Sequence, residues 1–317
     1  MGRFILKRIV ESLFVLLIGS VLCFAFIRVL PGDPAAAMYG DQLQKLSDAD
    51  RLRITENLGL DEPLPTQYAK WISQVFQGEW GQSTISGMDA ASVVAGSLQP
   101  TFLLLLSSQF LILILAVCFG VSTGLKHRSL YDHAVTIISF VFLSIPPFWF
   151  ALMLMIFFSV YLGVLPTSGI GNGEIRYLIL PSLVLALSHV GYFLRLIRNH
   201  IIMTKDSGFV FALKARGFSD WSILKNHLLP NASIPLLSYA GISLAVALAS
   251  SVVVETIFSW PGLGRLALKS ALAHDYPVLL AIIMLSMVFV ILVNLLVDLL
   301  CAWIDPRLRH DVLEEGQ

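Results

Sequence analysis

Charged residues are scarce in this chain. Asp, Glu, Lys and Arg make up 13% of the 317 residues, whereas hydrophobic residues make up 56%. Soluble domains carry a smaller apolar share than this, so we expect an integral membrane protein. The 21 basic residues balance the 21 acidic ones, and the lack of a basic excess argues against a nucleic-acid partner.

Cysteine is also sparse, and two common catalytic motifs are missing. The three cysteines, Cys23, Cys118 and Cys301, lie in apolar runs without the paired spacings of a zinc site or a disulfide framework. We interpret them as small hydrophobic side chains. The chain contains neither G-x-x-x-x-G-K-[ST] nor H-E-x-x-H. It is therefore not expected to bind ATP through a P-loop, to hold a metal or to carry catalytic residues.

Long apolar runs are what the chain has instead. Runs long enough to cross a bilayer as helices occupy residues 9–30, 101–125, 134–162, 177–197, 234–258 and 277–303. They predict an all-α polytopic membrane protein with six transmembrane helices. The first run has the position of a signal peptide, but it is longer than a usual signal core and no small-x-small cleavage site closes it. We expect it to be retained as the first span.

Basic residues divide the connecting segments between the two sides of the membrane. Arg3, Lys7 and Arg8 precede the first run, and Lys126 and Arg128 follow the second. By the positive-inside rule the N- and C-termini are expected to be cytoplasmic. The predicted order is a first transmembrane helix at 1–30, an extracytoplasmic region at 31–100, a core transmembrane domain at 101–303 and a cytoplasmic tail at 304–317.

Residues 204–230 are the longest polar interruption in the apolar second half of the chain. Phe209, Leu213 and the stem of Arg216 recur at helical spacing. Gly217 can adopt a positive φ and end this helix, and Ser219 can cap a second one. A short helix with an apolar ridge and flanking cations suits docking on another protein, although it could also lie among lipid headgroups.

Several separated segments resemble one family of membrane proteins. The segment from Gly217 to His227-Leu228-Leu229-Pro230 is similar to the EAA loop of bacterial ABC importer membrane subunits, with Phe211-Ala212-Leu213 where that loop has Glu-Ala-Ala. Similarity to the dipeptide, oligopeptide and nickel branch of these importers extends to residues 30–34, 254–265, 274–278 and 294–298. On these motifs the chain is identified as a member of that family.

The resemblance implies an ABC importer permease fold with a cytoplasmic coupling helix, spanning the bacterial inner membrane several times. The chain would form half of a translocation pathway in a heterodimer with a second, homologous permease. Two ATP-binding subunits, which would use ATP and Mg, and an extracytoplasmic substrate-binding protein would complete the importer, and this chain would bind no cofactor itself. The coupling residues implied are Ala212, Ala215, Arg216, Gly217, Phe218, Ser219, His227 and Pro230.

Candidates for the pathway and its gating lie within the apolar runs. Pro146 and Pro147 remove two backbone donors and must kink or break the third run, either to line a pathway or as a plain packing kink. Pro181 is expected to interrupt the fourth run. His189, Asn294 and Asp298 are polar groups inside spans, with functional or structural hydrogen-bonding roles. The full set is Pro146, Pro147, Trp149, His189, Glu255, Asn294 and Asp298, and the outer-loop signature comprises Trp260, Pro261, Gly262, Gly264 and Asp275.

The substrate stays open at this point. The short loop at residues 165–176 and the Lys269-Ser270 pair followed by His274 resemble the nickel and metal-chelate permeases somewhat more than the dipeptide ones. Short peptides are the other candidate. A different class of function is an ATP-independent channel or secondary carrier, and a third is a membrane scaffold, which the broken third run and the polar loop disfavour.

Overall fold

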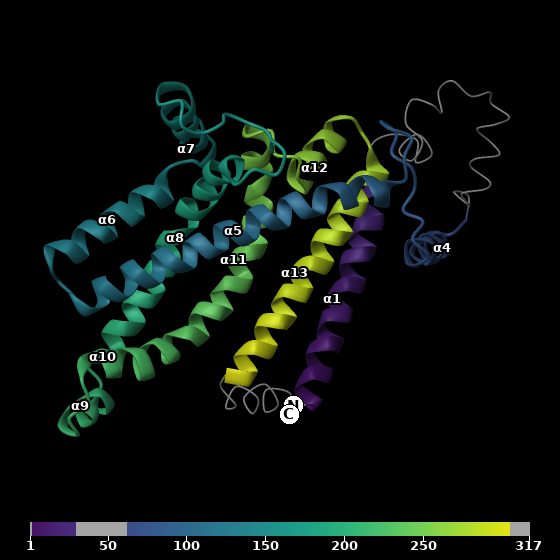
Figure 1. Ribbon diagram of the computed structural model, residues 1–317. Helices are drawn as coiled ribbons and strands as arrows, with labels where there is room; N and C mark the ends of the chain where they lie inside the picture. Colours follow the sequence, from purple (N-terminus) through teal and green to yellow (C-terminus); the bar gives the residue numbers. More distant parts are fainter. Residues whose placement is uncertain (1, 30–61, 305–317) are drawn as a thin grey trace. The chain divides into compact units, whose positions relative to one another are not determined.

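The computed structural model describes residues 2–29 and 62–304, so the motif at residues 30–34 and the predicted tail after residue 304 lie outside it. Within the described ranges the chain is helical (Figure 1), and its β contact is an isolated antiparallel bridge between Gln82 and Asp89. The predicted all-α class is confirmed. The helices are α1 (Gly2–Val29), α4 (Leu64–Phe76), α5 (Ala90–Leu125), α6 (Leu130–Ser144), α7 (Pro147–Leu154), η2 (Met155–Tyr161), α8 (Ile175–Lys205), α9 (Gly208–Ala215), α10 (Asp220–Ile223), η3 (Leu224–Leu228), α11 (Leu229–Ile257), α12 (Leu263–Leu272) and α13 (Tyr276–Ile304).

The described residues contain five single stretches of helix that are long and apolar enough to cross a membrane. They are Phe4–Ala25 in α1, the helices α5, α8 and α13, and the stretch Asp220–Ile257 that ends in α11. A further candidate is the pair Leu130–Ser144 and Pro147–Tyr161, whose halves are bent by 104°. With this pair taken as one broken span, the six predicted spans are all present.

Prolines interrupt the helix at Pro146 and Pro147, as predicted, but not at Pro181. α6 ends at Ser144, Ile145 is extended with φ −77° and ψ 126°, and Pro147 opens α7. Two consecutive prolines remove two donors and disfavour helical backbone before them, so the helix stops there. α8, in contrast, continues through Pro181. The predicted interruption of the fourth run is therefore wrong, because one missing donor is tolerated in a long apolar helix.

The described chain separates into two compact units. One contains residues 2–5, 102–260 and 293–304, and the other contains residues 6–29, 62–101 and 261–292. In the first unit α8 lies between α6 and α11 and packs against both (Figure 1). Its core includes Phe193, Ile197 and Ile201 of α8, which are buried together with Ile112 and Ala116 of α5.

Glycines bring α5 and α8 into close contact within the first unit. A β-carbon at Gly120 would lie 3.0 Å from the carbonyl oxygen of Leu194, and one at Gly124 would lie 3.1 Å from that of Arg198. The two glycines are four residues apart, which is the small-xxx-small spacing that lets membrane helices approach. This pattern is visible in the sequence, but its partner helix is not.

The five residues from Gly120 to Gly124 also match the G-x-S-x-G pattern of hydrolases. In a nucleophile elbow the serine lies in a sharp turn between a strand and a helix, whereas Ser122 lies inside α5. Its hydroxyl lies 3.1 Å from the carbonyl oxygen of Phe119, to which it donates, and 2.8 Å from the hydroxyl of Tyr131. The segment is therefore a helix-packing motif.

Small residues are frequent in α11, and Gly241 permits close packing against α13. A β-carbon there would lie 3.0 Å from Asn294 Oδ1 and 3.3 Å from Val297 Cγ2. Ser243, two residues further along α11, donates to Gln109 Oε1 of α5 over 2.8 Å. Small and polar side chains thus hold α11 against two neighbouring helices.

The second unit has an apolar cluster of its own. Residues 62–101 contain α4 and the first turns of α5, so helix α5 begins at Ala90 and not at the predicted Thr101. The backbone amide of Leu263, at the start of α12, donates to Thr101 Oγ1 over 2.7 Å. Leu263, Val278 and Ala281 are buried with Ala90 and Val94 in one apolar cluster.

Candidate functional site

Residues 204–230, which we call the docking loop, have the predicted helix–turn–helix form. α9 ends in a left-handed Gly217 with φ +83°. The amide of Phe218 donates to the carbonyl of Leu213 over 3.2 Å, which is the long closing bond of a glycine C-cap. Ser219 Oγ then accepts from the amide of Ser222 over 3.2 Å and caps α10. Local chemistry alone therefore accounts for this turn.

The docking loop is anchored by its inner face. Val210 and Leu213 of α9 are 2% and 8% exposed, and Ile223, Leu224 and Leu228 are buried beside them in the cluster that also contains residues of α5 and α8. The predicted ridge of Phe209, Leu213 and Arg216 is only partly right. Val210 takes the inner position, because a helix of eight residues buries a narrow face, and Phe209 is left 48% exposed.

The outer face of the docking loop exposes aromatic side chains. Phe211 is 77% exposed, Trp221 71% and Phe218 45%. Phe211 and Trp221 were not among the predicted coupling residues, although an aromatic residue at each position is plain in the sequence. Lys214 Nζ lies 2.8 Å from Asp220 Oδ1, so an ion pair joins α9 to α10.

The coupling residues predicted from the family pattern lie on or beside this outer face. The ring of His227 is half-buried, with its centroid 5.5 Å from that of Phe209 and 6.2 Å from that of Phe218. The remaining predicted residues are exposed: Ala212, Ala215, Arg216, Gly217, Phe218, Ser219 and Pro230.

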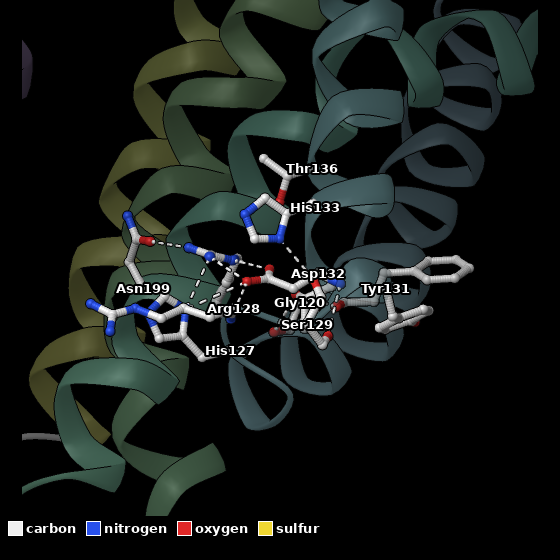
Figure 2. A network of polar contacts seen from close by, with 12 residues as sticks. Gly120, His127, Arg128, Ser129, Tyr131, Asp132, His133, Thr136 and Asn199 are labelled. Atoms are coloured by element: carbon white, nitrogen blue, oxygen red, sulfur yellow. Dashed lines mark hydrogen bonds and ion pairs between the residues drawn. The ribbon is translucent and has the colours of Figure 1, made fainter.

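A buried ion pair that was not predicted from the sequence joins α6 to α8 close to the docking loop (Figure 2). Asp132, 1% exposed, accepts from Arg198 Nε over 2.6 Å and from Arg198 Nη2 over 2.7 Å. The same carboxylate accepts from the backbone amide of Arg128 over 3.0 Å, and His127 Nδ1 lies 3.4 Å from it. Bidentate pairs of this kind fix geometry as well as charge.

A local signal for Asp132 does exist. Ser129 and Asp132 form the S-x-x-D pattern that begins a helix. The Ser129 hydroxyl accepts from the Asp132 amide over 3.1 Å, as such a cap requires. The Asp132 carboxylate, however, turns to Arg198, 66 positions away, and that partner follows only from the packing of α6 on α8.

The end of α8 makes a second polar contact, this time with the end of α5. Lys205 Nζ donates to the carbonyl oxygen of Leu125, the last residue of α5, over 2.9 Å. With the Asp132–Arg198 pair, two polar contacts hold the end of α8, where the docking loop begins.

The pathway candidates are distributed over several helices. Pro146 and Trp149 line an apolar cleft of about 610 Å³ at the bend of the broken span, and Pro147 begins α7 beside it. The other lining residues are Ile137, Phe140, Val141, Ser144, Ile145 and Phe148.

The remaining candidates lie away from that cleft. His189 is half-buried, with Nδ1 2.9 Å from the carbonyl oxygen of Leu185. Glu255 is fully buried near the end of α11. On α13, Asn294 is partly covered by α11 at Gly241 but is exposed on the whole, and Asp298 is half-buried. Across residues 2–29 and 62–304, no three His, Cys, Asp or Glu side chains are grouped closely enough to hold a metal ion.

The outer-loop signature has buried and exposed members. Trp260 is 1% exposed, and its amide donates to the carbonyl of Glu255 over 2.8 Å. The turn before it is made by Ser259, with φ +49°, and not by the glycines. In the second unit, Pro261 is exposed, Gly262 precedes α12 and Gly264 is buried in its first turn.

Asp275 is the most enclosed member of the signature. It is fully buried and accepts from Ser83 Oγ over 2.6 Å and from the amide of Thr84 over 3.1 Å. A charge-assisted clamp therefore fastens the segment around the Gln82–Asp89 bridge to the start of α13.

Comparison with known proteins agrees with this architecture. The chain is 35% identical to the oligopeptide transport system permease protein AppB of Bacillus subtilis, over 98% of this chain and all of that one. It is 34% identical to the glutathione transport system permease protein GsiC of Salmonella paratyphi A, with the same coverage. A chain of the inward-facing MetNI methionine ABC transporter has a TM-score of 0.56 at 19% identity, covering 67% of this chain and 96% of that one, which shows a shared fold.

Two family descriptions cover most of the sequence. Residues 1–94 match the N-terminal region of binding-protein-dependent transport system membrane components, and residues 116–310 match the inner membrane component itself. The chain is thus a multi-pass inner membrane protein and a non-catalytic part of its transporter. It belongs to the family of binding-protein-dependent transport system inner membrane components, the ABC importer permeases that include the dipeptide and oligopeptide branch.

Proposed function

We propose that this chain is one permease subunit of an ATP-driven importer of short peptides and forms half of its translocation pathway. The relatives named above transport oligopeptides and glutathione according to their names, and a further relative in Sinorhizobium fredii is described as a probable peptide ABC transporter permease. Nickel, the alternative drawn from loop lengths, has no support among them. Peptides are therefore the substrate class we propose.

The observation that carries the proposal is the docking loop. Its inner face is buried in the core of the first unit, while Phe211 and Trp221 project outward with cations beside them. Exposed aromatic side chains with a polar rim are typical of the centre of a protein interface. We propose that this surface docks on an ATP-binding subunit and that the docking loop is cytoplasmic, as are both chain termini.

The proposed assembly contains a second, homologous permease, two ATP-binding subunits that use ATP and Mg, and an extracytoplasmic binding protein that delivers the peptide. Closure of the ATP-binding subunits would move the docking loop. The contacts of Arg198 and Lys205 at the end of α8 would carry this movement into the spans. The pathway would then alternate between its two openings.

The docking surface is tested by replacing Phe211 with serine. We expect the purified complex to lose most of its ATP-binding subunits, because a central aromatic contact is removed. Phe76→Ser is the matched control: Phe76 is 86% exposed on α4, outside the docking loop, and its loss is expected to leave the complex intact. If both variants retain the ATP-binding subunits equally, the docking role is wrong.

Transport itself is tested by reconstitution. An ATP-independent channel or secondary carrier would move solute when this chain alone is placed in liposomes, whereas the proposed importer needs ATP and all its subunits. Uptake of labelled dipeptide and of labelled nickel, measured side by side, decides between the two substrate classes. Solute movement by the isolated chain would refute the proposal.

A further inference from the structure

One face of α8 is polar and exposed although the helix is a candidate membrane span. Tyr192, Arg195 and Asn199 are exposed, and Ser188 is half-buried. Steps of four, three and four residues place all four side chains on the same side of a helix. The opposite face is buried in the core of the first unit by Phe193, Ile197 and Ile201.

Arg195 extends away from the end of α8 that leads to the docking loop. Arg198 binds Asp132, and a β-carbon at Gly191 would lie 3.0 Å from the carbonyl oxygen of Ser139, so the backbone of Arg195 is level with the α6 segment between these partners. The guanidinium carbon of Arg195, however, lies 4.3 Å from the centre of the Phe140 ring, which is further along α6.

This direction matters because arginines near the ends of spans normally extend toward the nearest water. Phe140 is ten residues beyond the start of α6, or about 15 Å along the helix. A guanidinium held there cannot face hydrocarbon without a large cost, so it faces either protein or a water-filled cavity. Among the described residues no carboxylate lies within ion-pair distance of it.

The stacking on Phe140 leaves the edge of the guanidinium available. An arginine whose face rests on an aromatic ring can still donate two parallel N–H bonds to a carboxylate in its own plane. Tyr192 lies one turn away on the same face, 50% exposed. Its ring centroid is 6.3 Å from that of Tyr239 on α11, so a second hydroxyl-bearing ring lies next to Tyr192.

An apolar surface adjoins this cation. Phe140 also lines the cleft of about 610 Å³ at the bend of the broken span, together with Pro146 and Trp149. A fixed positive charge next to an apolar cleft suits an amphipathic anion. A short peptide is such a molecule, with a carboxylate at its C-terminus and an apolar side chain beside it.

We propose that Arg195, Tyr192 and Tyr239 form a subsite on the translocation pathway that binds the C-terminal carboxylate of the peptide in transit. This inference rests on the proposed import of peptides. Arg195 donates to the carboxylate, the two tyrosines border the bound group, and the cleft beside Phe140 receives the last side chain. No relative's name assigns these residues a role.

The test compares a free tripeptide with its C-terminal amide. The complete importer with its binding protein is reconstituted in liposomes, and uptake is measured with each peptide at a concentration that saturates the binding protein. We expect Arg195→Gln to lower uptake of the free peptide by about tenfold, the size of one lost charge-assisted hydrogen-bond pair, and to change uptake of the amide less than twofold. Arg195→Lys keeps the charge and is expected to recover part of the loss.

Arg176→Gln is the matched control, because Arg176 is an exposed arginine at the other end of α8 that donates to the carbonyl of Val164 over 2.7 Å. Equal loss of both peptides together with loss of the second permease would show that Arg195 is a subunit contact, which overturns the subsite. Unchanged uptake in Arg195→Gln would also overturn it. If the wild-type protein imports only the free peptide, the Arg195→Lys variant decides. Partial recovery of uptake supports the subsite, and no recovery overturns it. If it imports neither peptide, the proposed function itself fails.

Discussion

Replacing Arg198 with alanine should strongly destabilise this protein. Asp132 is 1% exposed and receives two hydrogen bonds of 2.6 and 2.7 Å from Arg198. The backbone amide of Arg128 would be left as its main remaining donor. Breaking a buried pair in this way leaves an uncompensated charge and costs about 3–5 kcal/mol.

That cost can be measured as a shift in thermal unfolding. For a chain of this size each kcal/mol corresponds to roughly 2 °C, so Arg198→Ala should lower Tm by about 6–10 °C. The double variant Asp132→Leu with Arg198→Met should lose less, because no charge is left buried. The assay is unfolding of the purified complex in detergent, followed by tryptophan fluorescence at one fixed scan rate.

Arg176→Ala is the control for this experiment, since Arg176 is exposed and donates to a single carbonyl. We expect its Tm to stay within about 1 °C of wild type. The reasoning is refuted if Arg198→Ala behaves like Arg176→Ala, or if the double variant is as unstable as the single one.

Backbone geometry and buried contacts lead to three other predictions. Gly217 has φ +83°, and a β-carbon there would meet no other atom within 4 Å, so Gly217→Val should cost about 1–2 kcal/mol of backbone strain alone and weaken ATPase docking. Gly217→Asn should bind normally in the same pull-down, because asparagine tolerates this conformation. Gly124→Val should lower Tm, since a β-carbon would lie 2.8 Å from Ile201 Cβ; overpacking of this kind costs about 1–3 kcal/mol, and an unchanged Tm would contradict the close packing of α5 on α8. Ser83→Ala should expose the segment around the Gln82–Asp89 bridge to proteolysis, because Asp275 loses a donor worth about 1.5–3 kcal/mol; equal cleavage rates in variant and wild type would show that the clamp does not hold that segment.

Much of the local structure could be predicted from the sequence. The length of an apolar run is compared with one fixed quantity, the thickness of the bilayer, so the spans were found without knowing what they touch. The bend at Pro146 and Pro147 and the turn at Gly217 and Ser219 follow from missing donors, a left-handed glycine and a serine cap. Errors arose where a local rule competes with its surroundings, as at Pro181, through which α8 continues.

The sequence by itself determined that the chain spans a membrane, where it breaks and where its polar docking loop lies. The tertiary structure alone decided which faces of the helices meet. When nearly every side of a helix is apolar, periodicity does not reveal its rotation or its neighbours. The pairing of Asp132 with Arg198 and the exposed polar face around Arg195 therefore became visible only once α6, α8 and α11 were packed together.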